Sequence, residues 1–428
     1  MNIGHILKTE RIKQNVKQVC LANGVCSVSY LSKIENNLTV PSDEILELLC
    51  KRLNIVINLH PEEKEQLIID NLFALYKNAI LNKDVQMVKK KCTLSNLNQY
   101  FLDCSLFNTY FLYLFRINLM LDSNSSTIRE IKQILIKNQK NFNSYQNFLF
   151  NLNMGLYHYS KGFYKEALRY LELQDKEKKS ISMEDWEKYD YYYVRGLCNL
   201  VNDQVLSAIE YTELALKYFQ NIFIVKKMLD CYIVISNGYK RNFKYTDARN
   251  LLIISEKIIE NGDIAEYRGI VYQNIGDLYS KEGNDQMALD YYMKSYHSEK
   301  DTLGYLTSTL SIVMIYSKMN ISQKVIEWSE LGLNFIQGEN SGKYTAFSHH
   351  FKVFKALHIA SQDDLVPTCK EAISFFETRS DFRFAHKYSI LIAKYFSEKA
   401  KYKDSHLYYQ KANQYLYQIK CIHAWEEL

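Results

Sequence analysis

The sequence predicts an all-α protein that joins a small N-terminal helical domain to a long array of stacked helical hairpins. Only three prolines and 14 glycines occur in 428 residues. Because these residues break helices or mark tight turns, their scarcity indicates long helices joined by short loops. A pair of small residues also recurs about every 40 residues, which is typical of a solenoid.

Composition favours a reduced protein of the cytoplasm. Nine cysteines are scattered without a CxxC pair, which indicates free thiols and argues against a disulfide framework or a zinc site. The N-terminus lacks the apolar core of a signal peptide, and the most apolar stretch, at 110–121, is too short to span a bilayer. We therefore expect a soluble cytoplasmic protein with no membrane partner.

Residues 1–60 parse as four or five short helices. The first is built around Ile6 and Leu7, and the second covers about residues 16–23. Gly24 follows the second helix, where a positive φ costs little and the chain can turn sharply.

The third helix lies in "SVSYLSKIENN" at 27–37, where Val28, Leu31 and Ile34 form an apolar stripe. The rest of this helix presents small polar groups and one aromatic ring. A fourth helix starts after the loop "NNLTVP", with Ser42 as its expected N-cap. Helix, glycine turn and helix form the plan of the helix-turn-helix, whose second helix enters the major groove of DNA.

The stretch "QVCLANGVCSVSYLSKIENNLTVPSDEILELLCKRL" resembles the N-terminal Cro/C1-type domain of the peptide-sensing quorum regulators of Gram-positive bacteria. This is the RRNPP group of Rap, Rgg, NprR, PlcR and PrgX proteins, and the layout is most like NprR and PlcR. The resemblance implies that four residues face the DNA groove: Ser27, Ser29, Tyr30 and Lys33. It also implies a phosphate contact by Gln18 and a structural role for Glu35.

Two features of this segment depart from the family pattern. Val19 and Cys20 stand where polar residues are usual, and Lys17 replaces a capping Thr or Ser. Residues 1–60 carry seven Lys and Arg against five Asp and Glu, so one copy would bind the phosphate backbone weakly, and we expect a homodimer or higher oligomer on the operator. The alternative is a helix-turn-helix kept for dimerisation or protein docking.

The rest of the chain repeats. Two small or apolar residues twelve positions apart mark each unit, and the unit returns with a period near 40, which predicts helical hairpins that stack on one another. The marker pairs are Gly155 and Ala167, Gly196 and Ala208, Ser236 and Ala248, Gly276 and Ala288, Val313 and Val325, Leu357 and Cys369, and Ala393 and Ser405. With Tyr279 and Tyr292, the pattern resembles the tetratricopeptide repeat.

These observations divide the chain into three parts. We expect a helix-turn-helix domain at 1–60, a linker helix opened by Pro61 at 61–75, and a tetratricopeptide-like domain at 76–428. The family resemblance implies that the repeats form a right-handed superhelical solenoid. Its concave surface would hold a short, extended signalling peptide that has been re-imported into the cell.

Three asparagines are candidates for holding the backbone of such a peptide. An Asn amide offers one donor and one acceptor, which match one peptide unit of any sequence. The resemblance places such residues two positions before the small glycine, which selects Asn153 and Asn274, and Asn237 lies next to the marker Ser236. The alternative for each is a solvated surface residue.

Arg116 interrupts the apolar stretch "YFLYLFRINLML". An unpaired guanidinium would be costly to bury there. It therefore either anchors an acidic group of the peptide or forms a structural ion pair between repeats, and Arg195 in "YYYVRGL" allows the same two interpretations.

No pattern of catalytic residues is present, and we expect neither an enzyme nor a cofactor. His349, His350 and His358 share one predicted helix without metal-binding spacing. The preferred hypothesis is a peptide-responsive transcription regulator. The alternatives are a repeat protein that docks on a response regulator and inhibits or dephosphorylates it, and a bare scaffold with a relic N-terminal domain.

Overall fold

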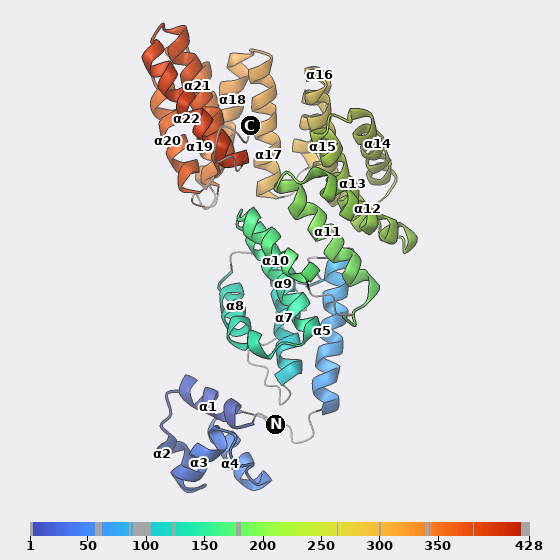
Figure 1. Ribbon diagram of the computed structural model, residues 1–428, viewed down its shortest axis with the longest axis vertical. Helices are drawn as coiled ribbons and strands as arrows, with labels where there is room; N and C mark the ends of the chain where they lie inside the picture. The colour runs from blue at the N-terminus through green and yellow to red at the C-terminus, as the bar shows by residue number, and fades with distance from the viewer. Residues whose placement is uncertain are drawn as a thin grey trace. The chain divides into compact units, whose positions relative to one another are not determined.

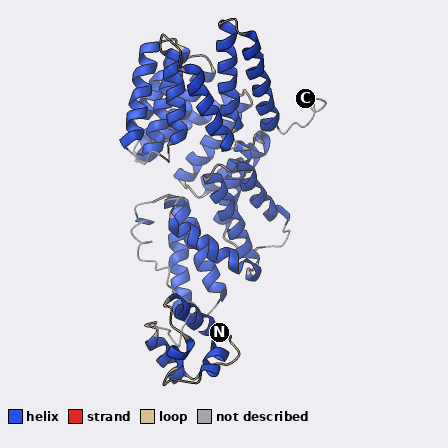
Figure 2. Cartoon of the chain, turned by 90° about the vertical axis from the view of Figure 1, so that its left-hand side faces the viewer, coloured by secondary structure: helices blue, strands red, loops and turns tan. Residues whose placement is uncertain are grey.

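The all-α prediction is confirmed over the residues that the structure describes. The computed structural model describes residues 3–55, 62–84, 87–88, 104–121, 125–176, 181–262, 264–298, 301–338, 342, 344–379 and 381–420. These ranges contain helices, turns and loops but no strand (Figure 2). The chain divides into two compact units, Met1–Gly238 and Tyr239–Leu428, which are described separately.

Four short helices form the N-terminal domain, where the sequence predicts four or five. They are α1 (Ile3–Lys13), α2 (Gln18–Ala22), α3 (Val28–Glu35) and α4 (Asp43–Arg52) (Figure 1). Leu7, Leu21, Leu31 and Leu49 are fully buried and give this domain a core of its own. Gly24 turns the chain between α2 and α3 with φ +73°.

Two details of this domain differ from the prediction. Val28 is 39% exposed, because it is the first residue of α3 and the buried stripe begins one turn later, at Leu31. Ser42 occupies the N-cap position of α4 but makes no capping hydrogen bond with its side chain. Ser27 does cap α3, where its Oγ accepts a hydrogen bond from the Tyr30 N–H at 3.1 Å.

The repeat array begins with three helices, α5 (Glu62–Asn82), α7 (Cys104–Leu121) and α8 (Ser126–Asn138). The predicted boundary between residues 75 and 76 lies inside α5, and Pro61 lies outside the described residues. The division into domains at 1–60, 61–75 and 76–428 therefore stays a prediction. α7 contacts α5, α8 and α9 and so lies at the centre of this part of the first unit.

Seven predicted hairpins are found, each as two consecutive helices (Figure 1). The pairs are α9 (Ser144–Ser160) with α10 (Tyr164–Lys176), α11 (Asp185–Val201) with α12 (Val205–Asn221), α13 (Val225–Arg241) with α14 (Tyr245–Asn261), α15 (Arg268–Lys281) with α16 (Asp285–Ser298), α17 (Thr302–Lys318) with α18 (Ser322–Gly338), α19 (Thr345–His358) with α20 (Leu365–Thr378), and α21 (Phe382–Glu398) with α22 (Tyr402–Lys420).

In the hairpins whose two helices belong to one unit, the marker residues lie where the helices approach each other, as at Gly155, Gly196 and Gly276. The second marker of every pair is buried, and in the last hairpin the Ser405 hydroxyl donates a hydrogen bond to the Ala393 carbonyl at 2.8 Å. Among the first markers, Leu357 is the exception, because it is only half-buried, while its neighbour Ala356 is 6% exposed. In that repeat the buried marker position is therefore Ala356, one residue before the predicted position.

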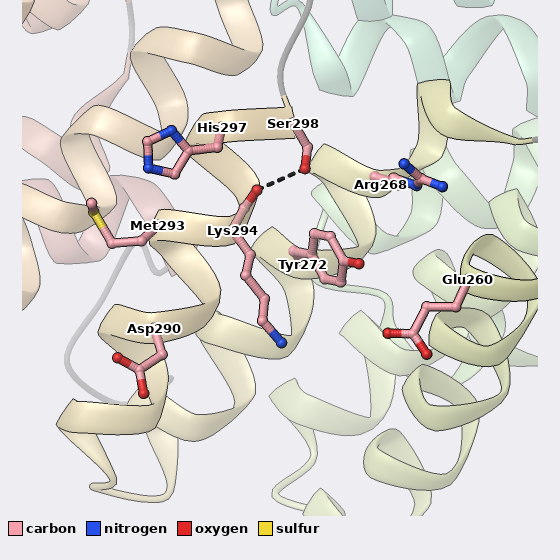
Figure 3. A pocket seen from close by; sticks show the side chains of 8 residues that line it. All are labelled: Glu260, Arg268, Tyr272, Asp290, Met293, Lys294, His297 and Ser298. Atoms are coloured by element: carbon pink, nitrogen blue, oxygen red, sulfur yellow. Dashed lines mark hydrogen bonds between the residues drawn. The ribbon is translucent and has the colours of Figure 1, made fainter.

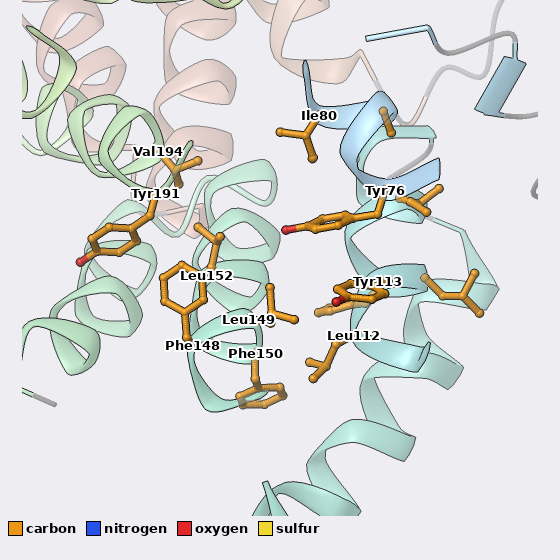
Figure 4. Close-up of a cluster of buried hydrophobic side chains, with 14 of the residues drawn as sticks. Tyr76, Ile80, Leu112, Tyr113, Phe148, Leu149, Phe150, Leu152, Tyr191 and Val194 are labelled. Carbon is orange, nitrogen blue, oxygen red and sulfur yellow. The ribbon is translucent and has the colours of Figure 1, made fainter. Parts of the chain in front are cut away.

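Large aromatic and aliphatic side chains from α5, α7, α9 and α11 build the core of the first unit (Figure 4). Tyr76 stacks on Tyr113 with ring centroids 4.8 Å apart. Phe148 and Tyr191 connect α9 to α11 with centroids 5.8 Å apart. Burial of this apolar surface is the main driving force that packs the first helices of successive hairpins.

The close contact at Gly196 yields a stability prediction. A Cβ atom added there would lie 2.0 Å from Thr212 Oγ1, whereas a Cβ at Gly155 would be no nearer than 3.0 Å to Leu171. Gly196→Ala should therefore destabilise the first unit by about 1–3 kcal/mol through overpacking, despite the better helix propensity of alanine. Urea titration followed by circular dichroism measures this effect, with Gly155→Ala as the matched control. Equal midpoints for the two variants would contradict the assigned contact.

Candidate functional site

The structure places the predicted DNA-contacting residues on α3 and at the start of α2. Ser29 and Lys33 on α3 are exposed, as is Ser27, its N-cap residue. Tyr30 is partly buried because its ring packs against the core of the domain. The side of α3 opposite Leu31 and Ile34 is thus free to meet a large ligand.

A buried carboxylate fixes the orientation of this helix. The Glu35 side chain is fully buried and accepts hydrogen bonds from Arg11 Nε at 2.6 Å, Arg11 Nη2 at 2.9 Å and Gln18 Nε2 at 2.7 Å. Burial raises the pKa of Glu35, but the hydrogen bonds from Arg11 and Gln18 outweigh it and lower the pKa overall. The network ties α1, α2 and α3 together, and any phosphate contact by Gln18 would involve a side chain that already holds Glu35.

Arg52 is a structural residue of this domain that sequence reasoning missed. Its Nη1 donates to the carbonyl of Leu21 at 3.1 Å and to that of Asn23. These carbonyls lie at the C-terminal end of α2, where helices leave acceptors unpaired. Arg52 thereby attaches α2 and its glycine turn to α4.

A buried charge cluster joins three helices in the first unit. Arg116 on α7 and Lys227 on α13 both bind Asp190 on α11, with Nη2–Oδ2 and Nζ–Oδ1 distances of 2.7 and 2.5 Å. All three side chains are at most 6% exposed. Burial raises the pKa of Asp190, but the two cations outweigh it and lower the pKa below its usual value.

Arg116 therefore forms the structural ion pair that was one of its two predicted roles. Its Nε and Nη1 atoms are buried and have no hydrogen-bond partner among the described residues. A guanidinium has five N–H donors, so much of its capacity is left for another acceptor. The ion pair with Asp190 does not by itself remove Arg116 as a ligand anchor.

Glu187 lies one turn before Asp190 on α11, and no cation among the described residues forms an ion pair with it. Its carboxylate accepts hydrogen bonds from the Tyr145 hydroxyl at 2.7 Å and from the Glu184 N–H at 3.1 Å. The Tyr145 hydroxyl is 3.0 Å from that of Tyr113. Burial outweighs both hydrogen bonds and raises the pKa of Glu187 to about 7.

Asp190, Lys227 and Glu187 were not found from the sequence. The signal that could have revealed two of them is the helical spacing of Glu187, Asp190 and Val194, which places two carboxylates on a buried stripe. Lys227 lies in the next hairpin, so only the fold brings it to Asp190.

The candidate asparagines of the first unit differ in exposure. Asn153 is fully buried, and its Nδ2 donates to the Leu112 carbonyl on α7 at 2.9 Å. The interpretation of Asn153 as a solvated surface residue is therefore wrong. Its Oδ1 atom is buried without a partner among the described residues, and Asn237 is half-buried.

Asn274 in the second unit is 6% exposed and is also engaged. Its Nδ2 donates to the Ile270 carbonyl at 2.8 Å, and Lys240 Nζ donates to its Oδ1 at 3.1 Å and to its main-chain oxygen at 3.2 Å. Burial lowers the pKa of Lys240 to about 8, although Asp277 at 3.9 Å acts in the opposite direction. A peptide that used Asn274 would exchange one of these hydrogen bonds for its own.

The remaining candidates have structural surroundings. Arg195 is buried, and its Nη1 donates to the Leu168 carbonyl at 3.4 Å. His350 hydrogen-bonds Tyr388, and His358 lies 2.8 Å from the Ser317 hydroxyl. Over the described ranges, no three or more His, Cys, Asp or Glu side chains are grouped so that they could hold a metal ion. Among the described helices, none has the length and apolarity needed to cross a bilayer.

Known proteins match both parts of the chain. The helix-turn-helix family matches residues 7–56. The transcriptional activator NprA of Geobacillus stearothermophilus is 26% identical over 409 residues, which cover 92% of this chain and 98% of NprA. The response regulator aspartate phosphatase H of Bacillus subtilis is 23% identical over 74% of this chain and 86% of its own.

Solved structures match the fold. A Rap protein complexed with competence and sporulation factor has a TM-score of 0.71 at 15% identity and covers 84% of this chain and 99% of its own. NprR in complex with its cognate peptide NprX has a TM-score of 0.61 at 21% identity and covers 81% and 99%. The resemblance to the peptide-sensing regulators is thus confirmed, as is the fold class of a helix-turn-helix followed by tetratricopeptide-like repeats.

The position of Glu187 yields a prediction about pH. A carboxyl whose folded pKa lies above its unfolded value near 4.3 stabilises the fold fully below that value, and this stability is lost as pH rises through the folded pKa. The first unit should therefore lose about 2–3 kcal/mol through this group between about pH 4.5 and 7.5. Glu187→Gln should remove that loss, while Glu210→Gln, an exposed control on α12, should keep the wild-type slope. Identical pH dependence of the urea midpoint in wild type and Glu187→Gln would disprove the assignment.

Proposed function

We propose that the chain is a cytoplasmic transcription regulator that binds DNA through its helix-turn-helix and responds to a short signalling peptide bound by its repeats. The observation that carries this proposal is the combination of both parts in one chain that aligns with almost the whole of a transcriptional activator. The role assigned is regulatory and not enzymatic.

The surface of α3 supports the DNA-binding part. Ser29 and Lys33 are one helical turn apart and both exposed, which suits an approach to base edges and phosphates. Glu35 neutralises Arg11 inside the domain, so this pair adds no net charge to the surface. The weak remaining charge favours a homodimer on an inverted repeat, because two half-sites double the number of phosphate contacts.

The first helices of the hairpins support the peptide-binding part. Asn153 and Arg116 lie at the contact of α7 with its neighbours, and both have buried polar atoms without partners among the described residues. An entering peptide can satisfy these atoms with a main-chain N–H and with an acidic side chain or carboxylate, respectively. Asn153 already donates a hydrogen bond to α7, and Asn274 bonds to its own helix and to Lys240 on α13. A peptide that binds these amides would therefore rearrange contacts between helices.

The alternative is a repeat protein that docks on a response regulator and inhibits or dephosphorylates it. It is supported by the likeness to response regulator aspartate phosphatase H over 74% of the chain. The two functions separate experimentally, since only the first requires Ser29, Tyr30 and Lys33 to contact DNA.

The DNA-binding proposal predicts two kinds of effect on α3. Ser29→Ala and Tyr30→Phe remove only a hydroxyl, and each should cost about 1–3 kcal/mol on the selected operator and relax its sequence preference. Lys33→Gln should weaken all sequences evenly and reduce the slope of log affinity against log salt by about one. Operators selected from a random duplex pool provide the probe, and fluorescence anisotropy gives the affinities.

Lys51→Gln on α4 is the matched control for lost charge. If the two hydroxyl variants keep the affinity and selectivity of the wild type, α3 does not read bases. If no DNA sequence is selected from the pool, the result favours the alternative function, in which the repeats dock on a response regulator.

The peptide-binding proposal predicts a loss of affinity when one contact is removed. Asn274→Ala and Arg116→Lys should each weaken the cognate peptide by roughly 1–3 kcal/mol, because one polar group of the complex is left unpaired. Calorimetry on the full chain measures this, with Arg169→Lys on α10 as control, since that arginine is exposed and pairs with Glu166. Unchanged affinity in both site variants would reject these residues as ligands.

A further inference from the structure

The second unit carries a pocket on α14, α15 and α16 that none of the proposed roles uses (Figure 3). Its volume is about 580 Å³, which lies within the range of small-molecule sites. The lining includes Arg268 and Tyr272 from α15, Lys294 from α16 and Glu260 from α14.

This pocket lies on a different face of α15 from Asn274. Arg268 and Tyr272 are four residues apart and share one stripe of the helix. Asn274 follows Tyr272 by two residues, which turns it about 200° around the helix axis. The pocket is therefore separate from the residue assigned to the signalling peptide.

Charges of both signs line the pocket without neutralising one another. Arg268 and Lys294 are cations, Glu260 and Asp290 are carboxylates, and these four described residues form no ion pair with one another. The Lys294 ammonium lies 5.6 Å from the Tyr272 ring centroid and 4.4 Å from that of Tyr291. In Figure 3 its side chain lies between Asp290 and Glu260.

Glu260 and Arg268 both act on the Tyr272 hydroxyl. Burial raises the pKa of Tyr272, Glu260 and Glu256 raise it further, and Arg268 lowers it. Groups of both signs thus act on this hydroxyl, while Asp290 accepts a hydrogen bond from Gln286 Nε2 at 3.1 Å on its own helix. Separated charges of opposite sign match a ligand that carries both signs itself.

We propose that this pocket binds a small zwitterionic ligand, an amino acid or short peptide with free termini. Arg268 takes the ligand carboxylate, since its planar fork suits two parallel N–H···O hydrogen bonds. Glu260 takes the ligand ammonium, and Tyr272 provides the apolar floor between them. Because these charged groups are exposed and screened by water, the affinity is modest.

The test uses di-, tri- and tetra-alanine with free termini as probes, together with their N-acetylated and C-amidated forms. Saturation-transfer NMR on the full-length chain detects binding, and titration gives the dissociation constants. At least one length of free peptide should bind, and blocking either terminus should weaken it about tenfold.

Protein variants assign each terminus to its partner. Arg268→Gln should lower the affinity for the free peptide about tenfold but leave the affinity for the C-amidated peptide unchanged. Glu260→Gln should likewise lower the affinity for the free peptide but leave the affinity for the N-acetylated peptide unchanged. Lys281→Gln, which changes an exposed cation at the end of α15 that does not line the pocket, should bind the probes like the wild type.

Three results would overturn the proposal. The first is the absence of saturation transfer to any free peptide at about 10 mM. The second is equal affinity for free and doubly blocked peptides. The third is an equal loss of peptide affinity in Arg268→Gln and Lys281→Gln. A loss on Asn274→Ala that matches the loss on Arg268→Gln would place the probes in the other site.

Discussion

The carboxylate of Asp190 holds α7, α11 and α13 at one buried point, and the arrangement of the first unit depends on it. Its two oxygens are divided between Arg116 and Lys227 at 2.7 and 2.5 Å. Two buried cations without that carboxylate would be strongly unfavourable, since breaking a buried pair costs about 3–5 kcal/mol. The same cluster leaves Arg116 Nε and Nη1 without a hydrogen-bond partner among the described residues, and these are the atoms that the proposed peptide contact would use.

In the helix-turn-helix domain, too, a buried carboxylate joins several helices. Glu35 is buried and draws Arg11 and Gln18 onto α3, while Arg52 attaches the end of α2 to α4. Hydrogen bonds thereby tie the residues behind α3 together, while Ser29 and Lys33 on its other side are exposed. Support of this kind reduces the conformational entropy that a helix loses when it binds a partner. For a peptide to regulate such a domain, it must bind one arrangement of the repeats more tightly than another.

Much of the fold could be predicted from the sequence because it depends on local periodicity. The twelve-residue spacing of Gly155 with Ala167 and of Gly196 with Ala208 identified both helices of those hairpins. Residues whose partners are distant could not be predicted in the same way. Asp190 meets Lys227 only after two hairpins have stacked, and Asn274 meets Lys240 across α13 and α15. The sequence therefore revealed which positions are unusual, such as Arg116 in an apolar helix, but did not reveal the groups that surround them.

The proposed coupling of peptide binding to DNA binding is tested most directly by measuring the operator affinity of the full chain at increasing concentrations of the cognate peptide. Sedimentation follows the oligomeric state in the same samples. Binding at two coupled sites requires that the peptide change operator affinity by the same factor by which the operator changes peptide affinity. We expect the peptide to change operator affinity at least about fivefold and the operator to change peptide affinity by the same factor, or the oligomeric state to change with peptide binding. Tight peptide binding with unchanged operator affinity and unchanged oligomeric state would show that the peptide does not control DNA binding.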